Sequence, residues 1–180
     1  IELDQHVAGG DGIALVGPDR DDPGGQPGHH VDLDPLDGGA AARRAIGGEP
    51  LLAHYRVNAG YLPPQHWLHD EAQGGGRILG EACHFIDFCT YLCGALPRSV
   101  YASALPDPGG LHDTVSMNLE FENGSVAAIC YFANGSKELP KEYFEVYSSG
   151  CTGIIRDFKE LEIYSTGKPR RRKSFVQNKG

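Results

Sequence analysis

The chain of 180 residues lacks any apolar run close to the roughly 20 residues that a membrane-spanning helix needs. Its N-terminus also lacks the basic, apolar and small-residue zones of a secretory signal peptide. Positive charge is limited, since 16 Lys and Arg against 24 Asp and Glu give a formal net charge of -8. Neutralising phosphates requires a positive surface, so this balance argues against a nucleic-acid or anionic-membrane binder. We therefore expect a soluble cytoplasmic protein with no nucleic-acid and no membrane partner.

Cysteine is scarce, with five residues and no C-x-x-C pair. This odd number and irregular spacing fit neither a disulfide framework nor a zinc ribbon. Cys89 and Cys93 are four residues apart and would share a helix face, but two thiolates without nearby ligands make a poor metal site. We expect buried, reduced thiols and no bound metal.

Residues 1–47 contain almost no aromatic side chains and combine Gly-Gly and Pro-Gly pairs with clustered aspartates. Such a stretch buries too little apolar surface to offset the entropy lost on ordering it. Only residues 13–16 and 40–46 have the pattern of a short strand and a short helix. We expect a low-complexity, mostly irregular segment over 1–47 and one α/β domain over 48–180. The chain stops directly after a predicted strand, which fits a domain that is truncated at its end.

Residues 48–180 have the pattern of an α+β domain. Apolar and polar residues alternate over 51–57, which predicts a first strand. A glycine triplet precedes residues 78–92, which have helical apolar spacing, and Gly94 and Pro97 supply the stop. Further strands are predicted at 100–105, 114–121, 126–132, 143–147, 154–157, 161–164 and 174–176. Turn pairs such as Asn123-Gly124 separate them. We expect an open, mainly antiparallel sheet, arranged as a meander, with a long buried helix packed on one face and the basic run 168–173 in an exposed turn.

The predicted helix carries an apolar row and a polar stripe. The apolar row consists of Leu79, Ala82, Cys83, Ile86 and Cys93. The polar stripe consists of Arg77, Glu81, His84, Asp87 and Tyr91, at steps of four, three, three and four residues. Two interpretations stay open. Either the stripe faces water, or it lines a cleft in which His84 exchanges a proton while Asp87 or Glu81 orients its ring.

The segment GGGRILGEACHFID, residues 74–87, resembles the glycine triplet and the D-x-x-x-H-x-x-D motif of the glucose-fructose oxidoreductase and inositol dehydrogenase (Gfo/Idh/MocA) family. The resemblance extends from about residue 49 to 180 and includes YRVNAGY at 55–61 and YFANG at 131–135. His84 falls on the active-site histidine of the family. The family's aspartate four residues earlier is Gly80 here, with Glu81 one position later.

The resemblance implies a C-terminal domain that binds substrate and forms oligomers, in an NAD- or NADP-dependent oxidoreductase acting on a sugar-like or cyclitol hydroxyl. It implies that His84, Glu81 and Asp87 serve catalysis. It also implies that five residues bind substrate: Arg56, Asn58, Tyr61, His66 and Arg77. The alternative for the first four is an ordered surface loop, and the alternative for Arg77 is the water-facing stripe described above.

Two features of that family have no counterpart in this chain. These are the lysine of a Glu-Lys-Pro motif and a strand followed by G-x-G-x-x-G and a helix. We therefore expect the chain alone neither to bind NAD(P) nor to catalyse hydride transfer. The alternative is a non-catalytic assembly module that self-associates through the open sheet face, and both interpretations predict a homo-oligomer.

Overall fold

The computed structural model describes residues 39, 42, 43, 46, 50–70, 73–106 and 110–174. The chain divides between His30 and Val31 into two units, and every described residue belongs to the second. The strand predicted at 13–16, most of the irregular segment predicted over 1–47 and most of the strand predicted at 174–176 lie outside the described residues. The helix predicted at 40–46 is helical at the positions that are described, Ala42, Arg43 and Ile46.

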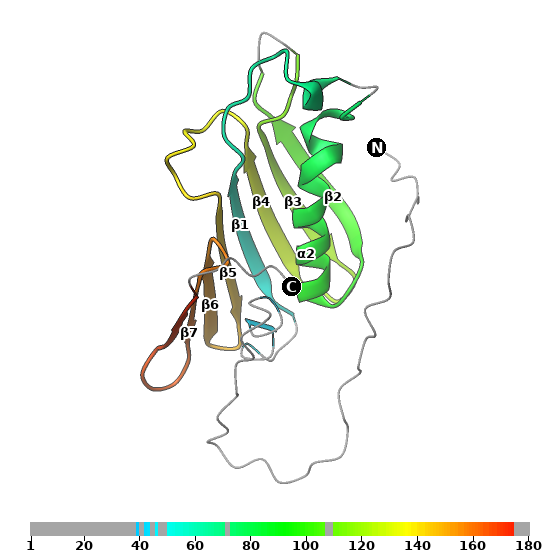
Figure 1. Ribbon diagram of the computed structural model, residues 1–180. Helices are drawn as coiled ribbons and strands as arrows, with labels where there is room; N and C mark the ends of the chain where they lie inside the picture. Colours follow the sequence, from blue (N-terminus) through cyan, green and yellow to red (C-terminus); the bar gives the residue numbers. More distant parts are fainter. Residues whose placement is uncertain are drawn as a thin grey trace. The chain divides into compact units, whose positions relative to one another are not determined.

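The second unit is built on one eight-stranded sheet with the order β2-β3-β4-β1-β5-β6-β7-β8 (Figure 1). The strands are β1 (Leu52–Asn58), β2 (Pro97–Ala104), β3 (Val115–Phe121), β4 (Val126–Phe132), β5 (Glu142–Ser148), β6 (Cys151–Arg156), β7 (Glu160–Tyr164) and β8 (Arg170–Lys173). All neighbouring strands are antiparallel except β1 and β4, which run parallel. The predicted open, mainly antiparallel sheet is confirmed.

The predicted meander is wrong at one place, because β1 lies between β4 and β5. The chain leaves β1, passes through the helix and enters the sheet again at its β2 edge. The hairpins β2-β3 and β3-β4 then bring the chain back beside β1, which makes the parallel pair. The hairpin expected at Asn134-Gly135 is therefore wrong, because this pair joins β4 to β5, which β1 separates. Turn chemistry is local, whereas this longer crossover depends on how the helix packs across the sheet.

The basic run 168–173 was expected to form an exposed turn. This prediction is wrong for Arg170–Lys173, because these residues form the edge strand β8. Arg171 pairs with Glu162 at 3.1 Å and Lys173 with Glu160 at 2.8 Å. Opposite charges across neighbouring strands stabilise a sheet, and charged side chains are well tolerated at an edge. The acidic partners on β7 therefore explain why the run is extended.

One helix covers a face of the sheet (Figure 1). It starts with a π-helical turn, Ile78–Ala82, continues as α2 (Cys83–Cys93) and ends at Gly94, whose φ of 67° is the left-handed cap predicted from the sequence. A π-helical turn contains more residues than an α-helical one, so it rotates the residues before it relative to those after it. The predicted apolar row is therefore wrong at Leu79 and Cys83, which are exposed. The buried positions are Ala82, Phe85, Cys89, Leu92 and Cys93.

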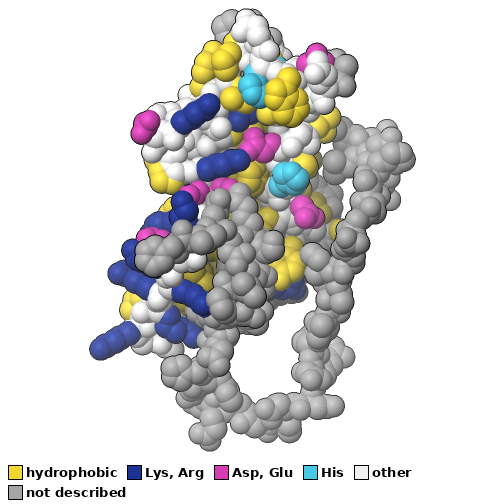
Figure 2. Space-filling model, viewed as in Figure 1, with side chains coloured by type: hydrophobic (Ala, Val, Ile, Leu, Met, Phe, Trp, Pro, Cys, Tyr) yellow, Lys and Arg dark blue, Asp and Glu magenta, His cyan; other side chains and the backbone are white. Residues whose placement is uncertain are grey.

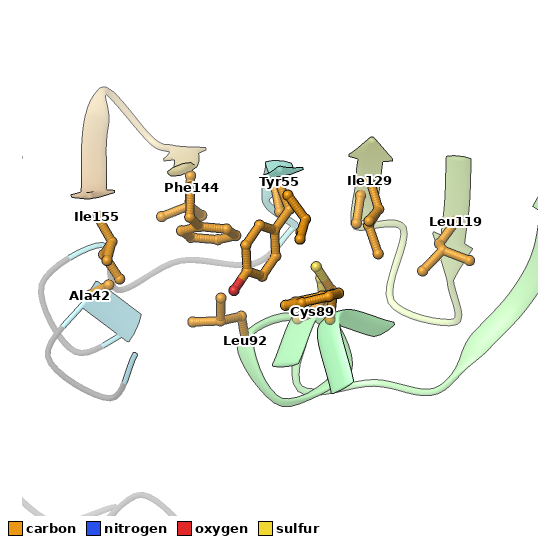
Figure 3. Close-up of a cluster of buried hydrophobic side chains, with 14 of the residues drawn as sticks. Ala42, Tyr55, Cys89, Leu92, Leu119, Ile129, Phe144 and Ile155 are labelled. Atoms are coloured by element: carbon orange, nitrogen blue, oxygen red, sulfur yellow. The ribbon is translucent and has the colours of Figure 1, made fainter. Parts of the chain in front are cut away.

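Most of the core lies between this helix and the sheet, and Ala42 and Ile46 before β1 also belong to it. Figure 3 shows Tyr55 of β1 at its centre, beside Phe144 of β5 and the helix residues Cys89 and Leu92. The Tyr55 ring packs edge-to-face on Phe144, with ring centroids 5.3 Å apart, and its hydroxyl donates a hydrogen bond to the buried carboxylate of Glu142. Strand β3 alternates between buried and exposed residues along its whole length, as predicted.

Three general expectations can be compared with the described residues. All five cysteines are free thiols, but only Cys89 and Cys93 are buried as expected, since Cys130 and Cys151 are partly buried and Cys83 is exposed. In the part of the chain that the structure describes, no three His, Cys, Asp or Glu side chains gather in a way that could hold a metal ion. Among the same residues, no helix combines the length and the apolarity needed to cross a bilayer.

Candidate functional site

Four polar side chains form a network where the π-helical turn meets the ends of β1 and β4: Arg77, Glu81, Tyr131 and Lys141. Arg77 is only 3% exposed. Its guanidinium donates hydrogen bonds to the Gly60 carbonyl at 2.7 Å, to the Ala59 carbonyl at 3.1 Å and to the Tyr131 hydroxyl at 3.0 Å. Arg77 therefore ties the start of the helix to the turn after β1, and its donors are used inside the protein.

Glu81 is the acceptor of this network. Its Oε2 accepts a hydrogen bond of 2.5 Å from the Tyr131 hydroxyl and lies 3.5 Å from Nη2 of Arg77, while Oε1 forms an ion pair with Lys141. Partial burial raises the pKa of Glu81, but the hydrogen bonds from Lys141 and Tyr131 and the two neighbouring cations outweigh it, so the pKa lies below its ordinary value. Burial, together with the hydrogen bond to Glu81, raises the pKa of Tyr131. At neutral pH the pair is a carboxylate and a phenol.

An open hollow of about 540 Å³ adjoins the network. It is lined by Asn58, Ala59, Asp157 and the segment 137–141, and Lys141 belongs to both the network and the hollow. Asn58 is buried, and its Nδ2 donates hydrogen bonds to the carbonyls of Ser136 at 2.7 Å and Leu139 at 3.0 Å. Asn58 therefore holds the segment that forms one wall of the hollow.

His84 and Asp87 lie on the exposed side of α2. Among the contacts of the described residues, no hydrogen bond or ion pair joins His84 to Glu81 or to Asp87. The predicted polar stripe is thus divided, with Arg77 and Glu81 turned into the protein and His84 and Asp87 turned to water. The π-helical turn between Arg77 and His84 is the physical reason, because α-helical spacing does not hold across it.

The loop after β1 brings exposed rings close to the helix start. Tyr61 and Trp67 are exposed, and Trp67 belongs to a 3-10 turn, Trp67–His69, in which Nδ1 of His66 accepts a hydrogen bond from the Leu68 amide at 3.3 Å. The turn packs on the glycine triplet, since a Cβ at Gly74 would lie 2.5 Å from Cα of Leu68. The first glycine of the triplet therefore permits this close contact of loop and helix.

Arg56 is not brought together with the other candidate residues. It alternates with Tyr55 along β1 and so lies on the sheet face opposite the helix, where it stacks over Tyr143 at 5.9 Å and donates to the Pro140 carbonyl at 3.0 Å. The sequence reasoning did not select Tyr131 and Lys141. A tyrosine at an inward position of an apolar strand can be recognised as a buried hydroxyl that needs a partner, whereas no pattern around Lys141 indicates its pairing with Glu81.

A comparison with family models gives the class of this domain, the C-terminal domain of an oxidoreductase family. The family model for the GFO/IDH/MocA C-terminal domain matches residues 41–152, which is more than half of the chain. The protein belongs to the Gfo/Idh/MocA family, and the matched residues are its C-terminal domain. A search of curated protein sequences finds no significant match.

Solved structures share the fold at low sequence identity. The aldose-aldose oxidoreductase from Caulobacter crescentus, complexed with glycerol, superposes with a TM-score of 0.62 at 18% identity, over 81% of this chain and 45% of that one. An NAD binding oxidoreductase from Klebsiella pneumoniae has a TM-score of 0.60 at 20% identity, over 77% and 43%. Levoglucosan dehydrogenase, in complex with NADH and levoglucosan, has a TM-score of 0.60 at 20% identity, over 76% and 44%. The chain thus spans less than half the length of these proteins.

Proposed function

We propose that this domain binds the substrate of an NAD(P)-dependent oxidoreductase that acts on a hydroxyl group of a sugar-like or cyclitol compound. The observation that carries the proposal is the position of His84: it is exposed on the first turn of α2, directly after the Glu81 network, in a domain of the Gfo/Idh/MocA family. Two of the structural relatives, an aldose-aldose oxidoreductase and levoglucosan dehydrogenase, are named for sugar substrates.

Each candidate residue has a role in this proposal. Because His84 is open to solvent and an imidazole ring can both accept and donate a proton, it exchanges the proton of the reacting hydroxyl. Asp87 supplies a carboxylate on the same side of the helix. Glu81 is a positioning residue, because it binds Tyr131 at the helix start and forms the ion pair that fixes Lys141. Arg77 and Asn58 act as positioning residues, since their donors bind backbone carbonyls.

The loop contributes the remaining contacts. Tyr61 and His66 lie on the segment that packs against the helix start, so they reach a substrate held above α2. Arg56 lies on the opposite sheet face, so we assign it to the surface that self-associates and not to the substrate site.

The described residues do not fit a dinucleotide. A cradle for its pyrophosphate is a strand that leads through a glycine-rich turn into a helix N-terminus. Here the glycine triplet follows a loop, and Leu68 fills the space beside Gly74. We therefore place NAD(P) binding outside the described residues, in a nucleotide-binding part of the enzyme, and derive no hydride-transfer step from this domain. The five free thiols fit a reducing compartment, and we infer a cytoplasmic location.

Ligand binding to the purified chain tests the proposal. We expect saturation-transfer NMR with a panel of monosaccharides and cyclitols to detect at least one ligand. His84→Ala and Asp87→Asn should weaken its binding at least fivefold with little change in melting temperature. His54→Ala, on the other sheet face, is the matched control. If no member of the panel binds to the folded chain, the proposal is wrong.

Calorimetric titration with NADH and NADPH tests the placement of the cofactor. We expect no heat of binding to a chain that circular dichroism shows to be folded. Micromolar binding of either nucleotide would overturn that placement and would assign hydride transfer to this chain itself.

A second candidate function is assembly through the outer sheet face, the face that lies away from α2. Leu52 of β1 and Tyr147 of β5 are direct neighbours on it, and both are exposed. Exposed apolar side chains that adjoin one another are typical of a contact surface. We infer that two copies of the domain associate there, which is compatible with substrate binding on the helix side.

A further inference from the structure

We propose that the hollow beside Lys141 binds a negatively charged group, a carboxylate or a phosphate, on the substrate of this domain. The inference rests on the proposed function, because it names the chemical class of the sugar-like compound that the same site would bind. It is carried by an imbalance of charge in the network and by the position of Lys141 at its edge.

Two cations share one carboxylate. Arg77 and Lys141 both lie within ion-pair distance of Glu81, at 3.5 Å for Nη2 of Arg77 and closer for Nζ of Lys141. Among the described residues, neither cation has a second carboxylate partner. The three groups together therefore carry one uncompensated positive charge.

That charge is accessible at only one of the two cations. The Arg77 side chain is buried, and its nitrogens donate to Ala59, Gly60 and Tyr131. Lys141 lines the hollow, and its side chain is 42% exposed. An ammonium group has three donors, of which Glu81 occupies one, so Lys141 retains donors for a ligand.

The remaining charged groups around the hollow do not cancel this excess. Lys137 lines the hollow as well, and its aliphatic stem crosses Gly60, where a Cβ would lie 2.8 Å from Cγ. Asp157 is paired with Lys159 at 3.2 Å. Glu138 is the one further lining carboxylate in the described part of the chain. The charged lining residues are thus two lysines and two carboxylates, Lys137, Lys141, Glu138 and Asp157. Because Lys159 pairs with Asp157, and because Arg77 and Lys141 share Glu81, the lining residues and their ion-pair partners together have one more cation than carboxylates.

The network also fixes the position of the ammonium group. The Tyr131 hydroxyl donates a hydrogen bond of 2.5 Å to Oε2 of Glu81, and the other carboxylate oxygen, Oε1, forms the ion pair with Lys141. A charge held in place before binding loses less freedom when the ligand arrives, and charge-assisted hydrogen bonds are stronger than neutral ones. The hollow of about 540 Å³ lies within the range of roughly 300–1,000 Å³ that is typical of small-ligand sites.

Figure 2 shows the face that carries α2 and the loops above it. Lys and Arg side chains (dark blue) lie there directly beside Asp and Glu side chains (magenta), in place of a wholly acidic surface. The overall negative charge of the chain therefore does not exclude an anionic ligand on this face.

Calorimetry with three sugars that differ in charge tests the inference. The purified chain is titrated with glucuronate, glucose 6-phosphate and glucose at one fixed, low ionic strength. We expect at least one of the two anionic sugars to bind at least tenfold more tightly than glucose. Preference for glucuronate identifies a carboxylate as the bound group, and preference for glucose 6-phosphate identifies a phosphate.

Three lysine variants assign the preference to the hollow. Lys141→Gln should abolish the tenfold preference, and Lys141→Arg should retain most of it. Lys173→Gln removes the same charge from the edge strand β8, where the side chain is 75% exposed, and should leave the preference unchanged. Melting curves of each variant confirm that it is folded.

Several results would overturn the inference. They are equal affinities for glucose and both anionic sugars, no binding of either anionic sugar, or equal effects of Lys141→Gln and Lys173→Gln. Binding of glucose without a charge preference would leave the proposed function standing. Absence of binding by every sugar and cyclitol would end both proposals.

Discussion

The hydroxyl of Tyr131 donates a hydrogen bond of 2.5 Å to Oε2 of Glu81, and this bond joins strand β4 to the π-helical start of the helix. The two residues are fifty positions apart in the sequence. Their contact holds the helix that presents His84 and positions the carboxylate that binds Lys141, so its strength can be measured through stability.

Removing the Tyr131 hydroxyl should destabilise the domain. We expect Tyr131→Phe to lower the free energy of unfolding by about 1–3 kcal/mol, because Glu81 loses a donor and Nε of Arg77 loses an acceptor inside the protein. The matched control is Tyr164→Phe, which breaks a 2.9 Å hydrogen bond to Glu162 on the outer sheet face and should cost less than about 0.5 kcal/mol. Urea unfolding of both variants measures the difference, and equal losses would contradict a special role for the Tyr131 bond.

Acidification should remove the contribution of Glu81. The pKa of this carboxyl is lowered in the folded protein, so its stabilisation is complete above the unfolded value of about 4.3 and is lost as the pH falls through the folded value. We expect the difference in unfolding free energy between the wild-type chain and Glu81→Gln to be largest near pH 7 and to shrink below about pH 4. The pKa of Glu162 is lowered too, but this residue is present in both proteins, so its effect cancels. A difference that is independent of pH would show that Glu81 is not linked to stability in this way.

Gly135 should not tolerate a side chain. A Cβ at this position would lie 2.0 Å from Oδ1 of Asn58, which is held by two hydrogen bonds to the neighbouring loop. We expect Gly135→Ala to cost about 1–3 kcal/mol through this overlap. Gly80→Ala is the matched control. Its Cβ would lie 3.1 Å from the nearest atom, the Gly74 carbonyl oxygen, and alanine has a higher helix propensity than glycine. We expect its free energy of unfolding to stay within about 1 kcal/mol of the wild-type value.

A double variant separates the overlap from other causes. If the clash with Asn58 is the reason, adding Asn58→Ala to Gly135→Ala should cost less than the sum of the two single effects, as measured by a double-mutant cycle in urea. Additive losses would mean that Gly135 is required for a different reason.

The outer sheet face should control the oligomeric state. We expect Leu52→Glu combined with Tyr147→Glu to shift the mass in light scattering from dimer to monomer, because two carboxylates would be buried in the contact. Leu105→Glu, an equally exposed leucine beyond β2, should leave the mass unchanged. An unchanged mass in the double variant would exclude assembly through this face.

The sequence was sufficient for features that depend on neighbours along the chain. Alternation predicted which side of β3 is buried, and Gly94 predicted the helix end. The glycine pairs at 123–124, 149–150 and 166–167 predicted three hairpins, because strand periodicity, turn conformation and the left-handed cap are local properties. It also contained the segment 74–87, whose resemblance pointed to the family that the model over residues 41–152 shows.

Tertiary structure decided what local spacing cannot specify. The helical spacing of Arg77, Glu81, His84 and Asp87 predicted one stripe, but the π-helical turn divides it into an inward and an outward pair. The pairing of Glu81 with Tyr131 and Lys141 joins segments that are fifty and sixty residues apart, and no local pattern encodes it. The position of β1 between β4 and β5 likewise follows from packing of the helix across the sheet. Local sequence determined the elements and the reactive side chains, and packing over long distances determined which of these side chains meet.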